Sequence, residues 1–162
     1  MHGSAADRVL ARGQDGVVSA FIEFFVASDD RMAAAVRYRG PASAFATVSG
    51  SFFYAEDAVL AWESSFTGQS VKELSAGGKP RMVAPWVNDG SGVFVLSDEL
   101  TGHLLRAGRA RLQALATEWS TAVVRDGDDL DVDEALRVVV GVAALARAAA
   151  ESGQLVYCWA AD

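Results

Sequence analysis

The sequence predicts an α+β fold, loosely α/β, in which a mixed sheet of about five strands carries helices mainly on one face. Three observations predict it. The chain ends in a long apolar helical segment that runs into an apolar strand, strand-like and helix-like segments alternate before that pair, and 51% of the residues are hydrophobic. At 162 residues the chain has the size of one domain. We expect a flexible or short-helical tail over residues 1–16 and a single α+β domain over residues 17–162.

The C-terminal pair has the most regular pattern. Asp131 is suited to cap the helix, and Glu134, three residues later, completes a capping box. Apolar residues then recur at helical spacing beside a narrow polar stripe, so we expect a mostly buried helix that ends at Gly153. Residues 155–160 follow as a strand. Because both of its faces are apolar, this C-terminal strand is predicted to lie in the interior of the sheet.

Turn and capping residues delimit the other elements. The run of turn residues from 88 to 92 predicts a hairpin, and Pro85, which has no N–H, places the first strand of that hairpin at an edge or a bulge. The connection after the first strand is long enough for a crossover, so we expect some parallel pairing. The remaining strands are predicted over 17–27, 45–54, 81–87 and 93–96, and the remaining helices over 28–39, 56–67, 70–76 and 98–124, the last as one kinked helix or two.

Charge and composition narrow the classes of function. The net charge is −7 and basic residues do not cluster, which argues against nucleic acid or an anionic membrane surface as a partner and favours a cationic one. Cys158 is the only cysteine, so no internal disulfide is expected, and its apolar neighbours predict an inert thiol. We see neither a signal peptide nor a membrane span and expect a cytoplasmic protein. Arginine dominance over lysine suggests a GC-rich, bacterial genome.

The acidic connector that precedes the last helix resembles a calcium loop, because carboxylates alternate along it. The pattern lacks a glycine at the position of the sharp turn and a glutamate at the closing position. We therefore expect a solvated acidic turn that caps the last helix, and no metal and no cofactor. The connector's aspartates are Asp126, Asp128, Asp129, Asp131 and Asp133.

Glu23 is the best single candidate for a catalytic acid. It alternates with two phenylalanines on one face of the first strand, where an apolar setting would raise its pKa. The alternative is that Glu23 pairs with Arg37 or Arg39, or reaches solvent, and we favour this structural role. Glu63 is a second candidate acid, and either arginine would complete a carboxylate pocket. His103 is expected to be a partly exposed helical side chain rather than a catalytic one.

Aromatic side chains beside acids mark two candidate binding places. Trp62 stands next to Glu63, and Trp86 shortly precedes Asn88 and Asp89. Such pairs can line a pocket for a cationic or sugar-like ligand. They also occur as core aromatics with a solvated neighbour, and this alternative remains open.

The leading functional hypothesis is a non-enzymatic binding protein that acts through a protein partner, with an immunity or inhibitor protein that masks a cationic partner as one concrete form. It rests on the acidic charge, the aromatic residues and the lack of a catalytic motif. The runner-up is a small enzyme or ligand-binding module with a carboxylate and arginine pocket. Either a monomer or a homodimer is compatible with the sequence.

Overall fold

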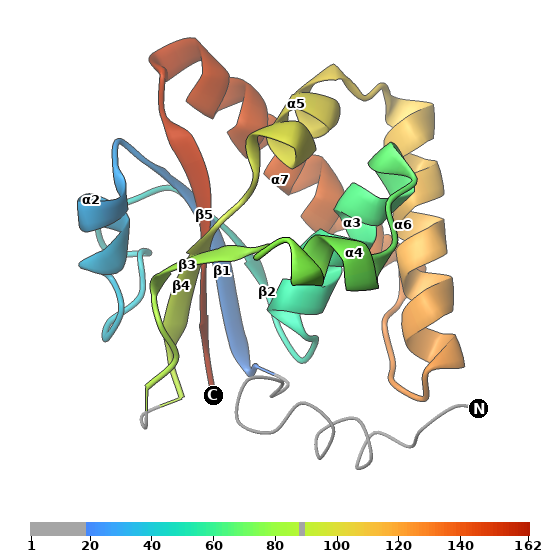
Figure 1. Cartoon of the computed structure of the whole chain (residues 1–162), viewed down its shortest axis with the longest axis horizontal. Helices are drawn as coiled ribbons and strands as arrows, with labels where there is room; N and C mark the ends of the chain where they lie inside the picture. Colours follow the sequence, from blue (N-terminus) through green and yellow to red (C-terminus); the bar gives the residue numbers. More distant parts are fainter. Residues whose placement is uncertain (1–18, 88–89) are drawn as a thin grey trace.

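The computed structural model describes residues 19–87 and 90–162 (Figure 1). The predicted tail at 1–16 and the turn residues Asn88 and Asp89 lie outside them. The described chain forms the strands β1 (Phe21–Ala27), β2 (Thr47–Gly50), β3 (Arg81–Ala84), β4 (Gly92–Val95) and β5 (Leu155–Ala161), and the helices α2 (Asp30–Ala34), α3 (Ala55–Thr67), α4 (Val71–Ala76), α5 (Asp98–Arg106), α6 (Arg109–Arg125) and α7 (Val132–Ser152).

The five strands form one sheet in the order β2-β1-β5-β4-β3. The C-terminal strand β5 pairs with β1 along its whole length, from Phe21 opposite Ala161 to Ala27 opposite Leu155, and with β4 on its other side. This confirms the predicted α+β class and the interior position of the last strand. The apolar residues on both faces of β5 fit this position, because both faces of the middle of the sheet are covered by packed side chains.

The prediction of a mixed sheet was wrong, because every neighbouring pair of strands is antiparallel. A parallel return needs a crossover, usually a helix of a dozen residues or more. The segment between β1 and β2 contains the five-residue helix α2 followed by turns, and β2 runs back along β1.

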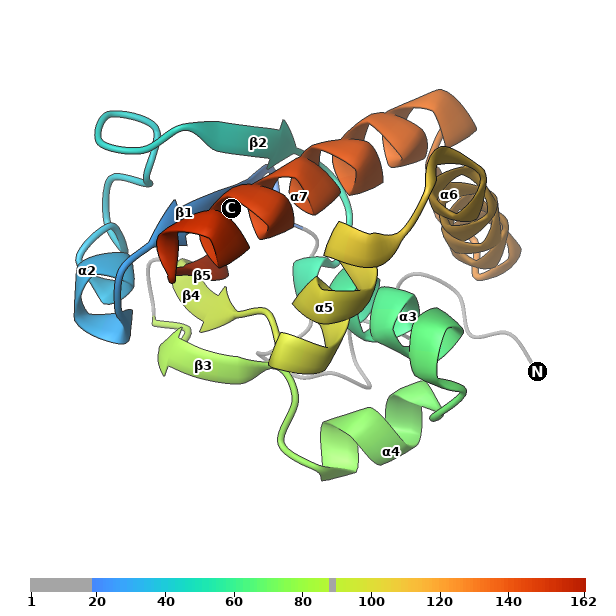
Figure 2. The ribbon, with the colours of Figure 1, turned by 90° about the horizontal axis from the view of Figure 1, so that it is seen from above.

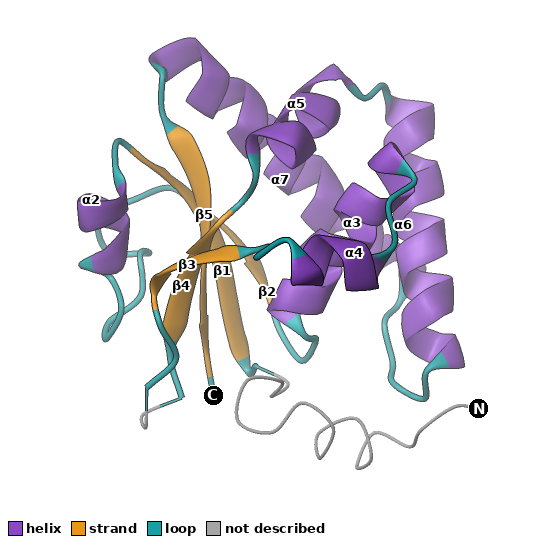
Figure 3. Cartoon of the chain, in the orientation of Figure 1, coloured by secondary structure: helices purple, strands orange, loops and turns teal. Residues whose placement is uncertain are grey.

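Helices pack mainly on one face of the sheet, as predicted. Figures 1, 2 and 3 show α2 on one side of the sheet and the other helices on the opposite side. The side chains of β1 alternate accordingly. Ile22 and Phe24 join the core under α3, α5, α6 and α7, whereas Phe25 and Ala27 join a smaller core with α2. The period of two in a strand thus gives the sheet two apolar faces of unequal size.

Helix α7 begins and ends where its capping residues predict. The carboxylate of Asp131 accepts hydrogen bonds from the backbone N–H groups of Asp133 (3.1 Å) and Glu134 (3.2 Å). The Glu134 carboxylate binds Arg137 instead of completing the capping box. Gly153 takes the left-handed conformation at the other end (φ 67°), which glycine adopts without steric cost.

Three other predicted boundaries change. Helix α2 ends at Ala34 rather than near residue 39, since turns follow it up to Gly40. The second strand covers only Thr47–Gly50, and the strand predicted at 81–87 ends at Ala84. Of the two alternatives left open for 98–124, two helices form, α5 and α6, divided at 107–108. Strand β3 is an edge strand with an irregular register between Met82 and Ala84, as the nearby proline predicted. Within 19–87 and 90–162, no helix combines the length and the apolar character that crossing a bilayer requires.

Candidate functional site

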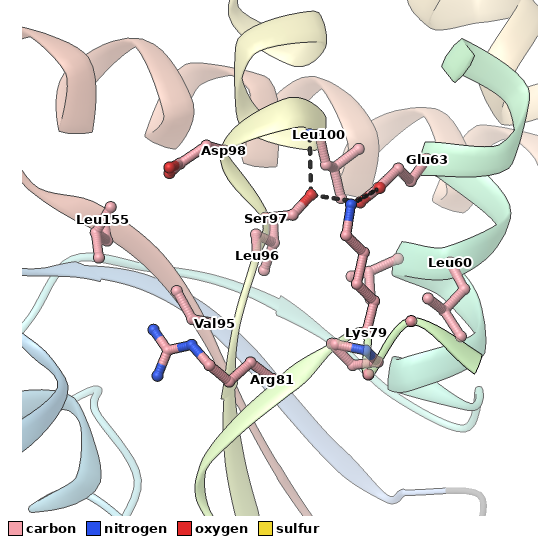
Figure 4. A pocket seen from close by; sticks show the side chains of 14 residues that line it. Leu60, Glu63, Lys79, Arg81, Val95, Leu96, Ser97, Asp98, Leu100 and Leu155 are labelled. Carbon is pink, nitrogen blue, oxygen red and sulfur yellow. Dashed lines mark hydrogen bonds and ion pairs between the residues drawn. The ribbon is translucent and has the colours of Figure 1, made fainter. Parts of the chain in front are cut away.

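Glu63 of α3 is a buried carboxylate with two polar partners. Its side chain is 3% exposed. Lys79, in the loop between α4 and β3, donates from Nζ to Glu63 Oε2 at 2.6 Å, and the hydroxyl of Ser97 donates to Glu63 Oε1 (Figure 4). Ser97 also caps α5, because its oxygen accepts the Leu100 N–H at 3.1 Å. Three elements that are distant in the sequence therefore meet at one carboxylate.

A cavity of about 390 Å³ opens beside this carboxylate. We call it the Lys79 cavity. Its polar side chains are Glu63, Lys79, Arg81, Ser97 and Asp98, and Figure 4 shows Arg81 and Asp98 on the side away from Glu63. The rest of the wall is mainly aliphatic. The apolar residues of the wall are Val59, Leu60, Pro80, Val95, Leu96, Leu100 and Leu155, with Gly77 and Gly78 beside them.

Electrostatics hold Lys79 in its charged form. The hydrogen bonds that Lys79 donates, first to Glu63 and then to Glu99, raise its pKa against the opposing effect of burial. The pairing also compensates the Glu63 carboxylate, which would otherwise be a costly buried charge. Lys79 is thus a fixed cation and not a neutral amine nucleophile. Sequence reasoning missed it, because the residue follows two turn glycines and has no local pattern that points to Glu63.

A second pocket, of about 310 Å³, lies between the start of α3 and the C-terminal end of α6. We call it the acidic–aromatic pocket. Among the described residues, the charged lining consists of Asp57, Arg125, Asp126 and Asp128, and each of the three aspartates also has a further interaction. Its aromatic lining consists of Phe52, Phe53, Tyr54 and Trp119, of which Phe52 is 69% exposed.

Glu23 lies on the face of the sheet that α2 partly covers. It pairs across strands with Trp159 and Ser49, and a Cβ on Gly40 would lie 3.4 Å from its Oε2. Burial raises the pKa of Glu23, as the apolar strand face predicted. Within residues 19–87 and 90–162, no basic side chain forms an ion pair with it.

The structure does not bring the four candidate catalytic residues together. Glu63 belongs to the helical face of the sheet, opposite the face of Glu23. Arg37 donates from Nη2 to the Pro85 carbonyl, and its own carbonyl accepts from Trp159 Nε1 at 2.8 Å. Arg39 is exposed. The cation beside Glu63 is a lysine rather than one of these arginines.

The candidate binding tryptophans lie in different settings. Trp62 is fully buried between Phe24 and Trp119, with ring centroids 5.7 and 5.1 Å away, which fits the core alternative. Trp86 is partly exposed and donates its indole N–H to Glu56. Asn88 and Asp89, expected beside Trp86, fall in the gap of the described chain.

His103 and Cys158 lie in surroundings that are typical of structural side chains. The His103 ring stacks on Phe66, with centroids 5.1 Å apart, and is partly exposed. Cys158 is buried, and burial raises the pKa of its thiol. Across the described part of the chain, no group of three or more histidine, cysteine or acidic side chains has a metal-binding arrangement.

Comparison with known proteins gives no relative from which a function could be carried over to either cavity. No family model, no curated protein and no solved structure matches this chain.

Proposed function

We propose that this protein is an acidic, non-enzymatic binding protein that acts through a cationic protein partner, in the manner of an immunity or inhibitor protein. The observation that carries the proposal is the net charge of −7. The acidic–aromatic pocket, whose described lining holds aspartates and the exposed ring of Phe52, is the place where we expect a cationic side chain to bind. The net charge gives long-range attraction for a cationic partner, which raises the rate of encounter.

The pocket offers two interactions to a lysine or arginine side chain of the partner. The exposed ring of Phe52 offers a face for cation–π contact, and the aspartates of the lining, which also have interactions of their own, make the surroundings of the pocket acidic. A guanidinium group suits both, because it is planar and always charged. This combination resembles the central anchor positions of protein interfaces, where arginine and aromatic residues are enriched.

Exposed apolar side chains at the two ends of the acidic connector can add to the proposed interface. Val124, in the last turn of α6, is 55% exposed, and Val132, in the first turn of α7, is 43% exposed. They flank the acidic connector on both sides. Apolar groups next to charged ones supply the burial that a charged patch alone lacks.

A capped tetra-arginine peptide tests the proposal, with binding followed by backbone amide chemical shifts. We expect shifts concentrated at residues 52–58 and 119–128, and a dissociation constant that rises steeply with salt, because charge attraction is screened. Asp128→Asn should weaken binding at least threefold. The matched control is Glu151→Gln, which removes one charge from the far end of α7 and should change affinity less than twofold. Equal effects of both variants, or no binding, would refute the pocket as the partner site.

A second candidate function is a small enzyme or ligand-binding module, and the Lys79 cavity favours it. Because Glu23 and Glu63 lie on opposite faces of the sheet, this alternative now rests on Glu63 alone. If Glu63 transfers a proton during turnover, Glu63→Gln should lower the rate on a substrate by about 10²–10⁴ while circular dichroism stays unchanged. Such a result on any substrate would displace the binding-protein proposal.

A further inference from the structure

The Lys79 cavity has the composition of a small-molecule site. Its volume of about 390 Å³ lies in the range of ligand pockets, and such pockets combine apolar walls with a few convergent polar groups. Here aliphatic side chains from α3, β4, α5 and β5 line most of the wall, and the polar groups gather around Lys79. These features are independent of the acidic–aromatic pocket, since the two cavities share no lining residue.

The two acids on Lys79 differ in how readily they can leave it. Glu63 is 3% exposed, so its separation from the ammonium would leave a buried, unpaired carboxylate. Glu99 is 62% exposed and loses little by returning to water. An incoming anion can therefore take the place of Glu99 on the ammonium while the pair between Lys79 and Glu63 stays intact.

We propose that the Lys79 cavity binds a small amphipathic carboxylate. The apolar body of the ligand packs against the aliphatic side chains of the wall, including Leu60 and Leu155. Its carboxylate accepts a hydrogen bond from Lys79 in place of Glu99. Ligand binding of this kind needs no part of the partner proposed above.

The charged side chains that line the Lys79 cavity favour a ligand with a single negative charge. Two cations, Lys79 and Arg81, and two anions, Glu63 and Asp98, line the cavity, so their formal charges cancel. Arg81 is already paired with Asp30 at 2.7 Å. A dianion such as a phosphate monoester would meet Asp98 without a second available cation, whereas a single carboxylate needs only Lys79. A cationic ligand would meet the ammonium of Lys79.

Octanoate is the probe, titrated into the full chain and followed by amide chemical shifts, with octanol as the neutral analogue. We expect shifts at residues 77–81 and 95–100 and at least tenfold tighter binding of octanoate, because a charged acceptor strengthens the hydrogen bond to an ammonium. Equal affinity for octanol, or shifts elsewhere, would overturn the proposal.

Glu99→Gln tests the displacement directly. The variant removes an exposed competitor from Lys79, so octanoate affinity should rise at least threefold. The control Glu151→Gln removes the same charge away from the cavity and should change affinity less than 1.5-fold. A Glu99→Gln affinity equal to that of the control would overturn the proposal.

Leu155→Phe tests the cavity itself, because a larger side chain occupies the space of the ligand body. Binding should weaken at least tenfold in a variant that melts cooperatively, and unchanged affinity would contradict the site. If this variant does not fold, the comparison of Glu99→Gln with Glu151→Gln decides. Tetra-arginine should still bind the octanoate complex, so failure of one proposal leaves the other measurable.

Discussion

Lys79 Nζ lies 2.6 Å from Oε2 of Glu63, a carboxylate that is only 3% exposed. The pair connects the loop before β3 to the middle of α3, and the Ser97 hydroxyl extends the connection to the first turn of α5. The same contact that forms the polar end of a cavity thus also joins three elements of the fold.

Lys79→Met should destabilise the protein strongly. The substitution leaves the Glu63 carboxylate buried without its cation, and breaking a buried pair in this way costs about 3–5 kcal/mol. Because Lys79 is 28% exposed, we expect the lower end of that range, about 3 kcal/mol, in urea unfolding at pH 7. The double variant Lys79→Met with Glu63→Gln removes both charges and should recover most of the loss. If the double variant is as unstable as the single one, the loss comes from packing and not from the unpaired charge.

Glu23→Gln should stabilise the protein at pH 7. Burial raises the folded-state pKa of Glu23, so between its ordinary pKa of 4.5 and the raised value the folded state binds more protons than the unfolded state. Stability then falls as pH rises through that window, and a neutral glutamine avoids the loss. The melting temperature of the variant should exceed that of the wild type at pH 7, and the difference should shrink at pH 4.

Asp30 supplies a control of opposite sign. Hydrogen bonds from Arg81 and then from Tyr157 lower the pKa of Asp30 below 3.8. The contribution of Asp30 to the free energy of unfolding is present above the ordinary pKa of 3.8. It is lost as the pH falls through the lowered pKa of the folded state. Asp30→Asn should therefore lower the melting temperature at pH 7 and have little effect near pH 2. If Glu23→Gln and Asp30→Asn shift the pH profile in the same direction, the assignment of these two environments is wrong.

Deletion of residues 155–162 should abolish cooperative unfolding. The deletion removes Tyr157, which is fully buried, and Trp159, which is 9% exposed, from the middle of the sheet. Loss of each such aromatic costs about 3–5 kcal/mol, so that the two approach the whole stability of a domain, roughly 5–15 kcal/mol. Calorimetry should show no sharp transition. A chain that lacks only the exposed Asp162 is the control and should melt normally, and a sharp melt of the longer deletion would contradict the central role of β5.

Millimolar calcium should shift the melting temperature by less than about 2 °C. Asp131 already accepts backbone N–H groups as the cap of α7, and Glu134 binds Arg137, so two of the connector's carboxylates are committed to other partners. Calcium needs six to eight oxygen ligands, and the connector supplies no closing glutamate. The measurement is a thermal melt with calcium and with chelator. A rise of many degrees that chelator reverses would identify a calcium site after all.

The features that the sequence alone determined are those set by neighbours within a few residues. Asp131 and Gly153 mark the ends of α7 because caps depend on the adjacent turn of backbone. The alternation in β1 placed Glu23 among phenylalanines because successive strand residues face opposite ways. The two apolar faces of β5 likewise predicted its interior position, because layers packed on both faces of a sheet cover its middle strands.

Only the tertiary structure decided the strand directions and the partners of the charged side chains. The 28–46 segment is long enough for a crossover or a reversal, and in the folded chain it makes the reversal, with α2 packed on the smaller core. The sequence made Glu63 a candidate acid with an arginine as the expected cation and gave no signal for Lys79, yet the fold buries the carboxylate and brings the ammonium of Lys79 to it. Arg37, expected beside Glu23, instead binds the backbone of Pro85. A long charged side chain reaches many partners at similar cost, so its choice depends on which groups the folded backbone brings near and not on its place in the sequence.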